Sequence, residues 1–202
     1  MKAPTPIAVL PLFWYKKIKT DTVVSTVSHN KDWQHHLSPF VLGPCNLYNG
    51  YTAQNVENAW QYSKVYGTLT TSDGDPAPSY FRWANRGWCD PVAHRYPMGK
   101  GAVPEYSYWN GKKLGYIQAR KVIYAPLYAE AVQRTAAFRK LKKLYKEAKR
   151  LVLLDFDAYD HAAQDMTLTD VLNEPKRKMG HAFVLAMLLL NDPALKQLKL
   201  RT

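Results

Sequence analysis

The stretch TAQNVENAWQYSKVY, residues 52–66, carries the strongest local signal for the fold of this chain. Thr52 suits a helix N-cap, and no glycine or proline interrupts the residues that follow, so we predict a helix over 52–66. On that helix Glu57, Gln61 and Lys64 fall at i, i+4 and i+7 and share one face. The row is either a polar stripe that faces a ligand or a solvent-facing row in which Glu57 is an ordinary acid of the first turn.

Regular structure is also predicted on both sides of this stretch. A β-branched run and a short apolar run predict strands over residues 22–27 and 151–156. Apolar side chains recur at steps of three and four over 126–149, which predicts a helix, and we expect a last, apolar helix over 175–190. Residues 67–115 combine many glycines and prolines with many aromatic side chains, so we predict an ordered but irregular insertion.

Positive charge is concentrated in one part of the chain. The sequence has 28 Lys and Arg residues against 16 Asp and Glu, a formal net charge of +12, and residues 112–150 alone hold twelve basic and two acidic residues. Such a surface attracts polyanions, and nucleic acid is the partner that we favour. The expected phosphate contacts are Arg139, Lys142, Lys143, Lys146 and Lys149. The alternative is a lysine-rich helix face that is only solvated.

Two further groups of polar residues are candidates for a site. The first consists of Asp155, Asp157, Tyr159, Asp160 and His161. These residues follow a predicted strand, whose end holds the backbone and leaves the side chains free, although a turn with capping acids has the same pattern. The second, Lys178 with Gly180, can hold phosphate near the start of the last helix, unless Gly180 only permits tight packing. The run YPMGKG at 96–101 lacks the spacing of a P-loop and is more simply a turn.

Several classes of protein are not expected from this sequence. The two cysteines form no C-x-x-C pair and the six histidines form no metal-ligand motif, so we expect neither a metal nor a disulfide framework. The first residues lack the pattern of a signal peptide, and the longest apolar block, residues 182–190, is too short to span a bilayer. We therefore expect a soluble, cytoplasmic protein that needs no cofactor and has no membrane partner.

The turn LSPF at 37–40 leads to the sequence ENAWQYSK at 57–64, and KMGHAFVL at 178–185 opens the last helix. In this order the segments resemble the NADAR (YbiA-like) superfamily of N-glycosidases, with its [FL]-S-N-F turn, its E-H-x-[FWY]-Q-x-x-K helix and its closing N-x-L-G-x-x-L-M. Asn58 stands where that family has histidine, and the predicted insertion is longer than the usual connection. The resemblance implies one α+β domain over residues 1–202, mainly helical with a small sheet.

The resemblance also implies cleavage of a C–N glycosidic bond in a ribosylated compound. The catalytic carboxylates would be Glu57, Asp157 and Asp160. The substrate-binding residues would be Trp60, Gln61, Lys64, Tyr159, Lys178 and Gly180. Because the basic charge suits a nucleic-acid substrate, we expect removal of an ADP-ribosyl or similar adduct from bases of DNA or RNA. A non-enzymatic nucleic-acid-binding protein and a metabolic N-glycosidase acting on a small ribosylated nucleotide are the alternatives.

Overall fold

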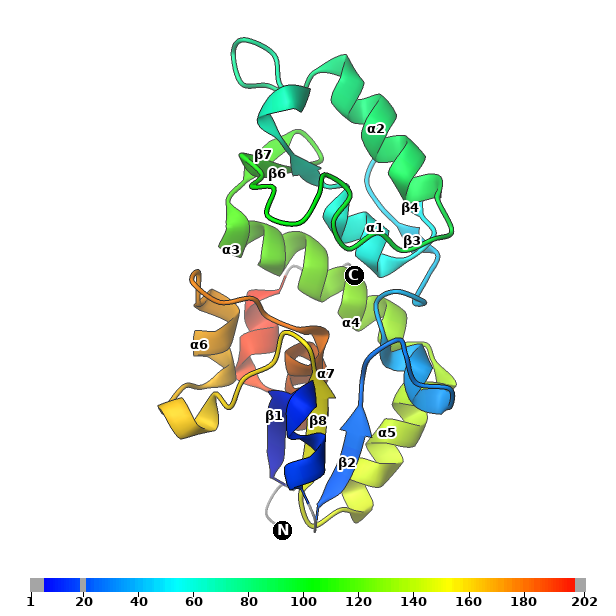
Figure 1. The fold of residues 1–202 in the computed structure, drawn as a ribbon, viewed down its shortest axis with the longest axis vertical. Helices are drawn as coiled ribbons and strands as arrows, with labels where there is room; N and C mark the ends of the chain where they lie inside the picture. The colour runs from blue at the N-terminus through cyan, green and yellow to red at the C-terminus, as the bar shows by residue number, and fades with distance from the viewer. Residues whose placement is uncertain (1–5, 19–20, 199–202) are drawn as a thin grey trace.

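A three-stranded parallel sheet lies at one end of the computed structural model, which describes residues 6–18 and 21–198 (Figure 1). Strand β8 (Leu151–Asp155) is central, between β1 (Ile7–Pro11) and β2 (Thr22–Ser25). All five residues of β8 are buried, which accounts for its unbroken apolar sequence, because a central parallel strand is covered on both faces. The two strands that the sequence predicts in this region are confirmed.

Several helices lie near this sheet (Figure 1). They are α4 (Ala125–Gln133), α5 (Ala136–Glu147), α6 (Leu168–Asn173) and α7 (His181–Leu190). Helix α7 packs against β8 and β1, and its residues 181–187 are all buried, so its almost continuous apolar sequence belongs to the core. Within the ranges that the structure describes, no helix is both long and apolar enough to cross a bilayer.

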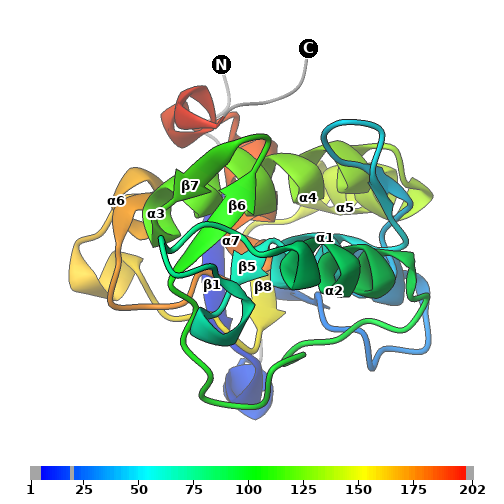
Figure 2. The ribbon, with the colours of Figure 1, turned by 90° about the horizontal axis from the view of Figure 1, so that it is seen from above.

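The other end of the molecule is built from two helices and short antiparallel strands. These elements are β3 (Cys45–Asn46), β4 (Thr52–Ala53), α1 (Val56–Gln61), β5 (Lys64–Val65), α2 (Pro78–Cys89), β6 (Tyr106–Trp109) and β7 (Lys112–Leu114). Strands β3 and β4 pair with each other, and β6 lies between β5 and β7. Figure 2 shows α1 and α2 side by side on this end.

The segment 67–115 is more regular than the sequence suggests, because it contains α2, β6 and β7. Tyr80, Ala84 and Trp88 recur every four residues on α2 and are completely buried. The aromatic side chains of this segment therefore form a second part of the core. Helix and sheet together place the chain in the α+β class, as predicted.

A continuous helical segment connects the two ends of the molecule (Figures 1 and 2). It begins as α3 (Tyr116–Ala119), continues as a π-helical turn (Arg120–Tyr124) and runs into α4. In the π turn the amide of Ala125 donates to the carbonyl of Arg120, an i to i+5 bond. Such turns are rare and often occur at functional sites. The remaining short helical turns are 3₁₀ helices at Leu12–Lys17, Trp33–Leu37, Gly67–Leu69, Ala162–Gln164 and Pro193–Gln197.

The helix predicted over 52–66 is wrong in its bounds. Helix α1 begins only at Val56, because the side chain of Asn55 accepts a hydrogen bond from the amide of Asn58 at 2.8 Å and caps it. Thr52 belongs to strand β4, and Lys64 belongs to strand β5.

Two other helices also differ from their predicted bounds. The helix predicted over 126–149 is divided into α4 and α5, because Thr135 has an extended backbone and its hydroxyl accepts from the amide of Phe138 at 3.0 Å. The last helix begins at His181 and not at 175. At Thr135 polar capping overrides the apolar periodicity on which the prediction was based, whereas the N-cap of α7, Gly180, makes no side-chain capping bond.

Candidate functional site

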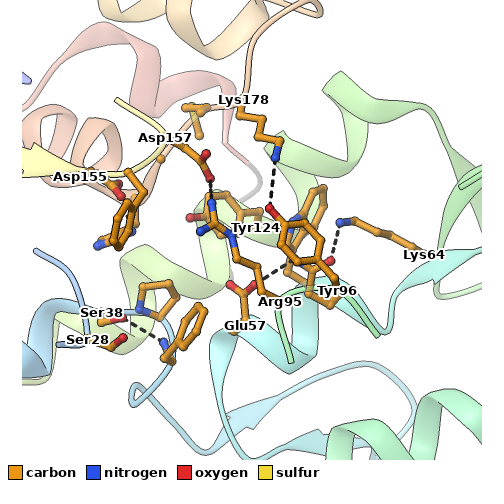
Figure 3. A pocket seen from close by; sticks show the side chains of 18 of the residues that line it. Ser28, Ser38, Glu57, Lys64, Arg95, Tyr96, Tyr124, Asp155, Asp157 and Lys178 are labelled. Atoms are coloured by element: carbon orange, nitrogen blue, oxygen red, sulfur yellow. Dashed lines mark hydrogen bonds and ion pairs between the residues drawn. The ribbon is translucent and has the colours of Figure 1, made fainter. Parts of the chain in front are cut away.

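A cavity of about 480 Å³ lies where the two ends of the molecule meet, and we call it the central cavity. Its walls come from α1, the π turn, the end of β8 with the residues after it, the start of α7 and the loop that follows α2. Its volume is in the range of sites that hold small organic ligands. Figure 3 shows the polar side chains that converge on it.

Glu57, Gln61 and Lys64 form a hydrogen-bonded row along one wall of the central cavity. The Gln61 amide nitrogen donates to Glu57 Oε1 at 2.8 Å, and Lys64 Nζ donates to Gln61 Oε1 at 2.6 Å. These two bonds fix the orientation of the amide and link the acid to the base. The row survives although Lys64 has left the helix, because the chain turns at the end of α1 and keeps Lys64 within reach. The glutamate is only 5% exposed.

Burial shifts the pKa values of Glu57 and Lys64 in this row. Loss of hydration raises the pKa of Glu57, and the hydrogen bond from Gln61 and the charge of Lys64 only oppose this effect. Burial also lowers the pKa of Lys64 to about 8, while the charge of Glu57 opposes that change. The ammonium of Lys64 lies 4.8 Å from the ring centre of Trp60, which adds a cation–π contact. Perturbed titratable groups of this kind are characteristic of functional sites.

Asp155 and His181 form a buried pair on the opposite wall. Asp155 Oδ2 accepts from the amide of Ala182 at 3.2 Å and lies 3.1 Å from His181 Nδ1. The other ring nitrogen of His181 lies 2.8 Å from the carbonyl oxygen of Thr26. Gly180 is required here, because a Cβ at this position would lie 2.2 Å from Asp155 Oδ2. The glycine therefore admits the carboxylate to the start of α7.

Arg95 and Asp157 face each other across the mouth of the cavity (Figure 3). Arg95 Nη2 donates to Asp157 Oδ2 at 2.8 Å, and both side chains are about one third exposed. Lys178 approaches from the same side as Asp157, with its Nζ 3.5 Å from the hydroxyl of Tyr96. The cavity that contains the buried carboxylate of Glu57 is therefore lined by the cations Lys64, Arg95, Arg120 and Lys178.

The structure brings most of the predicted site residues together, but Tyr159 and Asp160 do not line the cavity. Asp160 caps a turn by accepting from the amide of Ala163 at 3.1 Å. The ring of Tyr159 packs at 5.0 Å from that of Phe183. These two predictions are corrected, because the chain turns away from the cavity after Asp157.

The predicted nucleic-acid contacts also lie outside the cavity. The side chains concerned are Arg139, Lys142, Lys143, Lys146 and Lys149, all exposed on or just after α5. The free charge of the basic segment is smaller than its composition suggests, because Arg120 is buried and Lys113, Arg134 and Arg150 form ion pairs.

Sequence reasoning missed several residues of the central cavity. Arg95 and Tyr96 come from the loop that includes YPMGKG, whose glycines were a weak signal for a ligand-facing loop. Arg120 and Tyr124 are both brought to the cavity by the π turn, which has no reliable sequence signature. The sequence predicts Asp155 only as part of the acidic cluster, whereas the structure pairs it with His181 on the cavity wall.

The protein is therefore an α+β domain with a ligand-sized central cavity. One acid–amide–base row and several cations line this cavity. Residues 14–184 match the family described as "Family of unknown function (DUF6939)", so the chain belongs to this family, and the match includes every residue of the cavity. No match was found among curated proteins or among solved structures. Over residues 6–18 and 21–198, no three His, Cys, Asp or Glu side chains form a group that could hold a metal ion.

Proposed function

We propose that the protein is an N-glycosidase, which hydrolyses the bond between a ribosyl carbon and a nitrogen of a base, with Glu57 as the key carboxylate. The observation that carries this proposal is the row of Glu57, Gln61 and Lys64 on the wall of the central cavity. The resemblance of residues 57–64 to the NADAR helix supports the same chemistry. The substrate that fits best is a ribosyl compound with phosphate groups, because several cations line the same cavity as the carboxylate.

The reaction develops positive charge on the ribosyl ring as the bond to nitrogen breaks. A carboxylate held close to the anomeric carbon stabilises that charge, and its effect is large because Glu57 is buried. The raised pKa of Glu57 also makes it a better base for a proton of the attacking water. The water oxygen bonds to the ribosyl carbon, and the electron pair of the broken bond leaves with the base nitrogen. A guanine nitrogen then takes up the proton that the water gave to Glu57, whereas nicotinamide leaves as a neutral molecule and that proton passes to solvent.

The other residues of the cavity suit the remaining parts of such a substrate. The Gln61 amide is held between Glu57 and Lys64, so it can orient a ribose hydroxyl beside the carboxylate. The rings of Trp60 and Tyr124, with centres 5.4 Å apart, provide an aromatic surface for a base. Asp157 is the remaining candidate for a second carboxylate.

A nucleic acid that carries the ribosyl adduct is a second candidate substrate. The exposed cations of α5 favour it, because contacts to phosphates dominate the affinity of proteins for nucleic acids. A small ribosylated nucleotide needs only the cavity. The two substrates therefore differ in whether α5 contributes to binding.

The test compares two substrates, a guanine-linked ADP-ribosyl oligonucleotide and nicotinamide mononucleotide, and follows release of free ADP-ribose or ribose 5-phosphate. We expect release from at least one of them by the wild type. Glu57→Gln should release product about 100- to 1,000-fold more slowly, the loss typical of a key electrostatic group. Glu130→Gln, a change on α4 outside both the cavity and α5, is the matched control and should be unaffected.

Equal rates for wild type and Glu57→Gln would remove this residue from the mechanism. Tight binding of the oligonucleotide without release from either substrate would favour a nucleic-acid-binding protein without this activity.

A further inference from the structure

Residues 95–104 cross the mouth of the central cavity without helix or strand, and we call this segment the strap. Its first end is held by the buried side chain of Asn58, which donates to the carbonyls of Asp90 and Val92 and accepts from the amide of His94, all at 2.8 to 2.9 Å. Its second end is held where the amide of residue 105 donates to the carbonyl of residue 65 at 2.8 Å. The strap is therefore a loop with two firm anchors.

Between these anchors the strap is attached to the rest of the chain only weakly. Among the described residues, its hydrogen bonds and ion pairs to other segments are the pair of Arg95 with Asp157 at 2.8 Å and the contact of Tyr96 with Lys178 at 3.5 Å. Gly99 also has a positive φ, which gives this part of the strap a backbone that few other residues adopt readily. Few contacts and an exposed backbone are the features of a segment that opens locally.

Residues of the strap also line the cavity that contains the proposed reacting centre. Tyr96, Gly99 and Gly101 line the cavity from its outer side, and Glu57 is only 5% exposed although it lines the same cavity. A ligand that reaches Glu57 past this side must displace the strap. Figure 3 shows Arg95 in this barrier, between Glu57 and Asp157.

We propose that the strap is a lid and that Arg95 exchanges its partner Asp157 for an anionic group of the ligand, of the phosphate class, when the lid closes. Arg95 makes one bond to the aspartate, from Nη2 to Oδ2, and a phosphate oxygen can accept the same bond. Lys178 supplies a second cation beside the strap. The proposal rests on the proposed function only in taking the central cavity as the ligand site.

The first test measures binding of inorganic pyrophosphate by calorimetry at low ionic strength. Arg95→Met should weaken binding about tenfold or more, because it removes a charge-assisted contact. Asp157→Asn should strengthen binding about three- to tenfold, because it removes the competing carboxylate. Asp75→Asn is the control, since Asp75 pairs with Lys113 at 2.7 Å and does not line the cavity, and it should change nothing. Structural damage alone would weaken binding in both variants, so the opposite signs identify the exchange.

The second test follows hydrogen exchange of the backbone amides in residues 95–104. Asp157→Asn should accelerate exchange about three- to tenfold, as expected for a partly exposed ion pair, and pyrophosphate should slow it in the wild type. Exchange in β8 reports on the fold as a whole. If Asp157→Asn also accelerates exchange there, Lys178→Met replaces it as the variant that loosens the strap.

The proposal is overturned if pyrophosphate does not bind, if Arg95→Met binds it as well as the wild type does, or if loosening the strap leaves its exchange unchanged. Neither test measures turnover. If both tests give the expected results but no glycosidic bond is cleaved, the proposed lid stands and only the proposed function is wrong.

Discussion

Arg120 is a buried cation whose partners are backbone carbonyls, and its replacement by methionine gives a quantitative test of how the cavity wall is held. The residue is 2% exposed. One guanidinium nitrogen, Nη1, lies 3.0 to 3.1 Å from the carbonyl oxygens of Val171, Leu172 and Glu174, and Nη2 donates to that of Arg177 at 2.8 Å. The side chain thus joins the π turn to the end of α6 and to the loop that leads to Lys178.

The expected loss follows from the groups that methionine leaves without this donor. Each buried polar group left unsatisfied costs about 1–3 kcal/mol. The lower value applies here, because Arg120 lines the cavity and water can reach some of the oxygens. Four carbonyls at about 1 kcal/mol each predict that Arg120→Met lowers the free energy of unfolding by about 4 kcal/mol. Removal of a buried charge offsets part of this cost, so about 3 kcal/mol is the smallest loss that we expect.

Urea denaturation followed by circular dichroism measures this difference, with equal slopes for both proteins showing that the comparison is valid. Arg134→Met is the matched control, because that arginine is 70% exposed and its pair with Glu130 should contribute no more than about 0.5 kcal/mol. Arg120→Lys should fall between wild type and Arg120→Met, since a single ammonium cannot reach all four oxygens. A loss below about 3 kcal/mol for Arg120→Met would refute the view that these bonds hold the wall together.

Three further predictions concern the charges of the site and of α5. Because burial raises the pKa of Glu57 in the folded state, that state takes up a proton more readily than the unfolded chain, and stability falls as the pH rises between the two pKa values. Glu57→Gln should therefore be more stable than wild type at neutral pH and lack this pH dependence. The measurement is the urea midpoint of each protein at pH 5 and at pH 8. Midpoints that do not differ between the two proteins at either pH would contradict the prediction. If the protonated form of Lys64 supports turnover, kcat/KM should fall as the pH rises through about 8. Lys64→Arg should move that fall to higher pH. If the pH at which kcat/KM falls is the same in this variant, Lys64 is not the group responsible. Changing Lys142, Lys143 and Lys146 together to glutamate should weaken oligonucleotide binding and flatten its salt dependence without unfolding the domain, whereas unchanged binding across a salt series would show that this face is only solvated.

The amino-acid sequence by itself determined those features that depend on neighbours along the chain. Strands β2 and β8 follow from short β-branched or apolar runs, and the polar row follows from the spacing of Glu57 and Gln61 on one helical turn. The presence of helices in the basic segment and at the end of the chain was predictable for the same reason, although their bounds were not. Apolar periodicity shows which face of a helix is buried, but a polar cap such as Thr135 decides where that helix begins.

Only the tertiary structure decided which polar residues meet. Arg95 and Asp157 are 62 residues apart in the chain, and Arg120 reaches carbonyls 51 to 57 residues away. No local pattern encodes such pairs, because they depend on how the loop after α2 is held by Asn58 and on where the π turn directs its side chains. The same limit explains why the sequence predicts Asp160 in the site and why the charge count over 112–150 includes the buried Arg120. A charged residue has the same local sequence signature whether it faces water or a cavity, and only the packing of distant segments removes the water that changes its pKa and its chemistry.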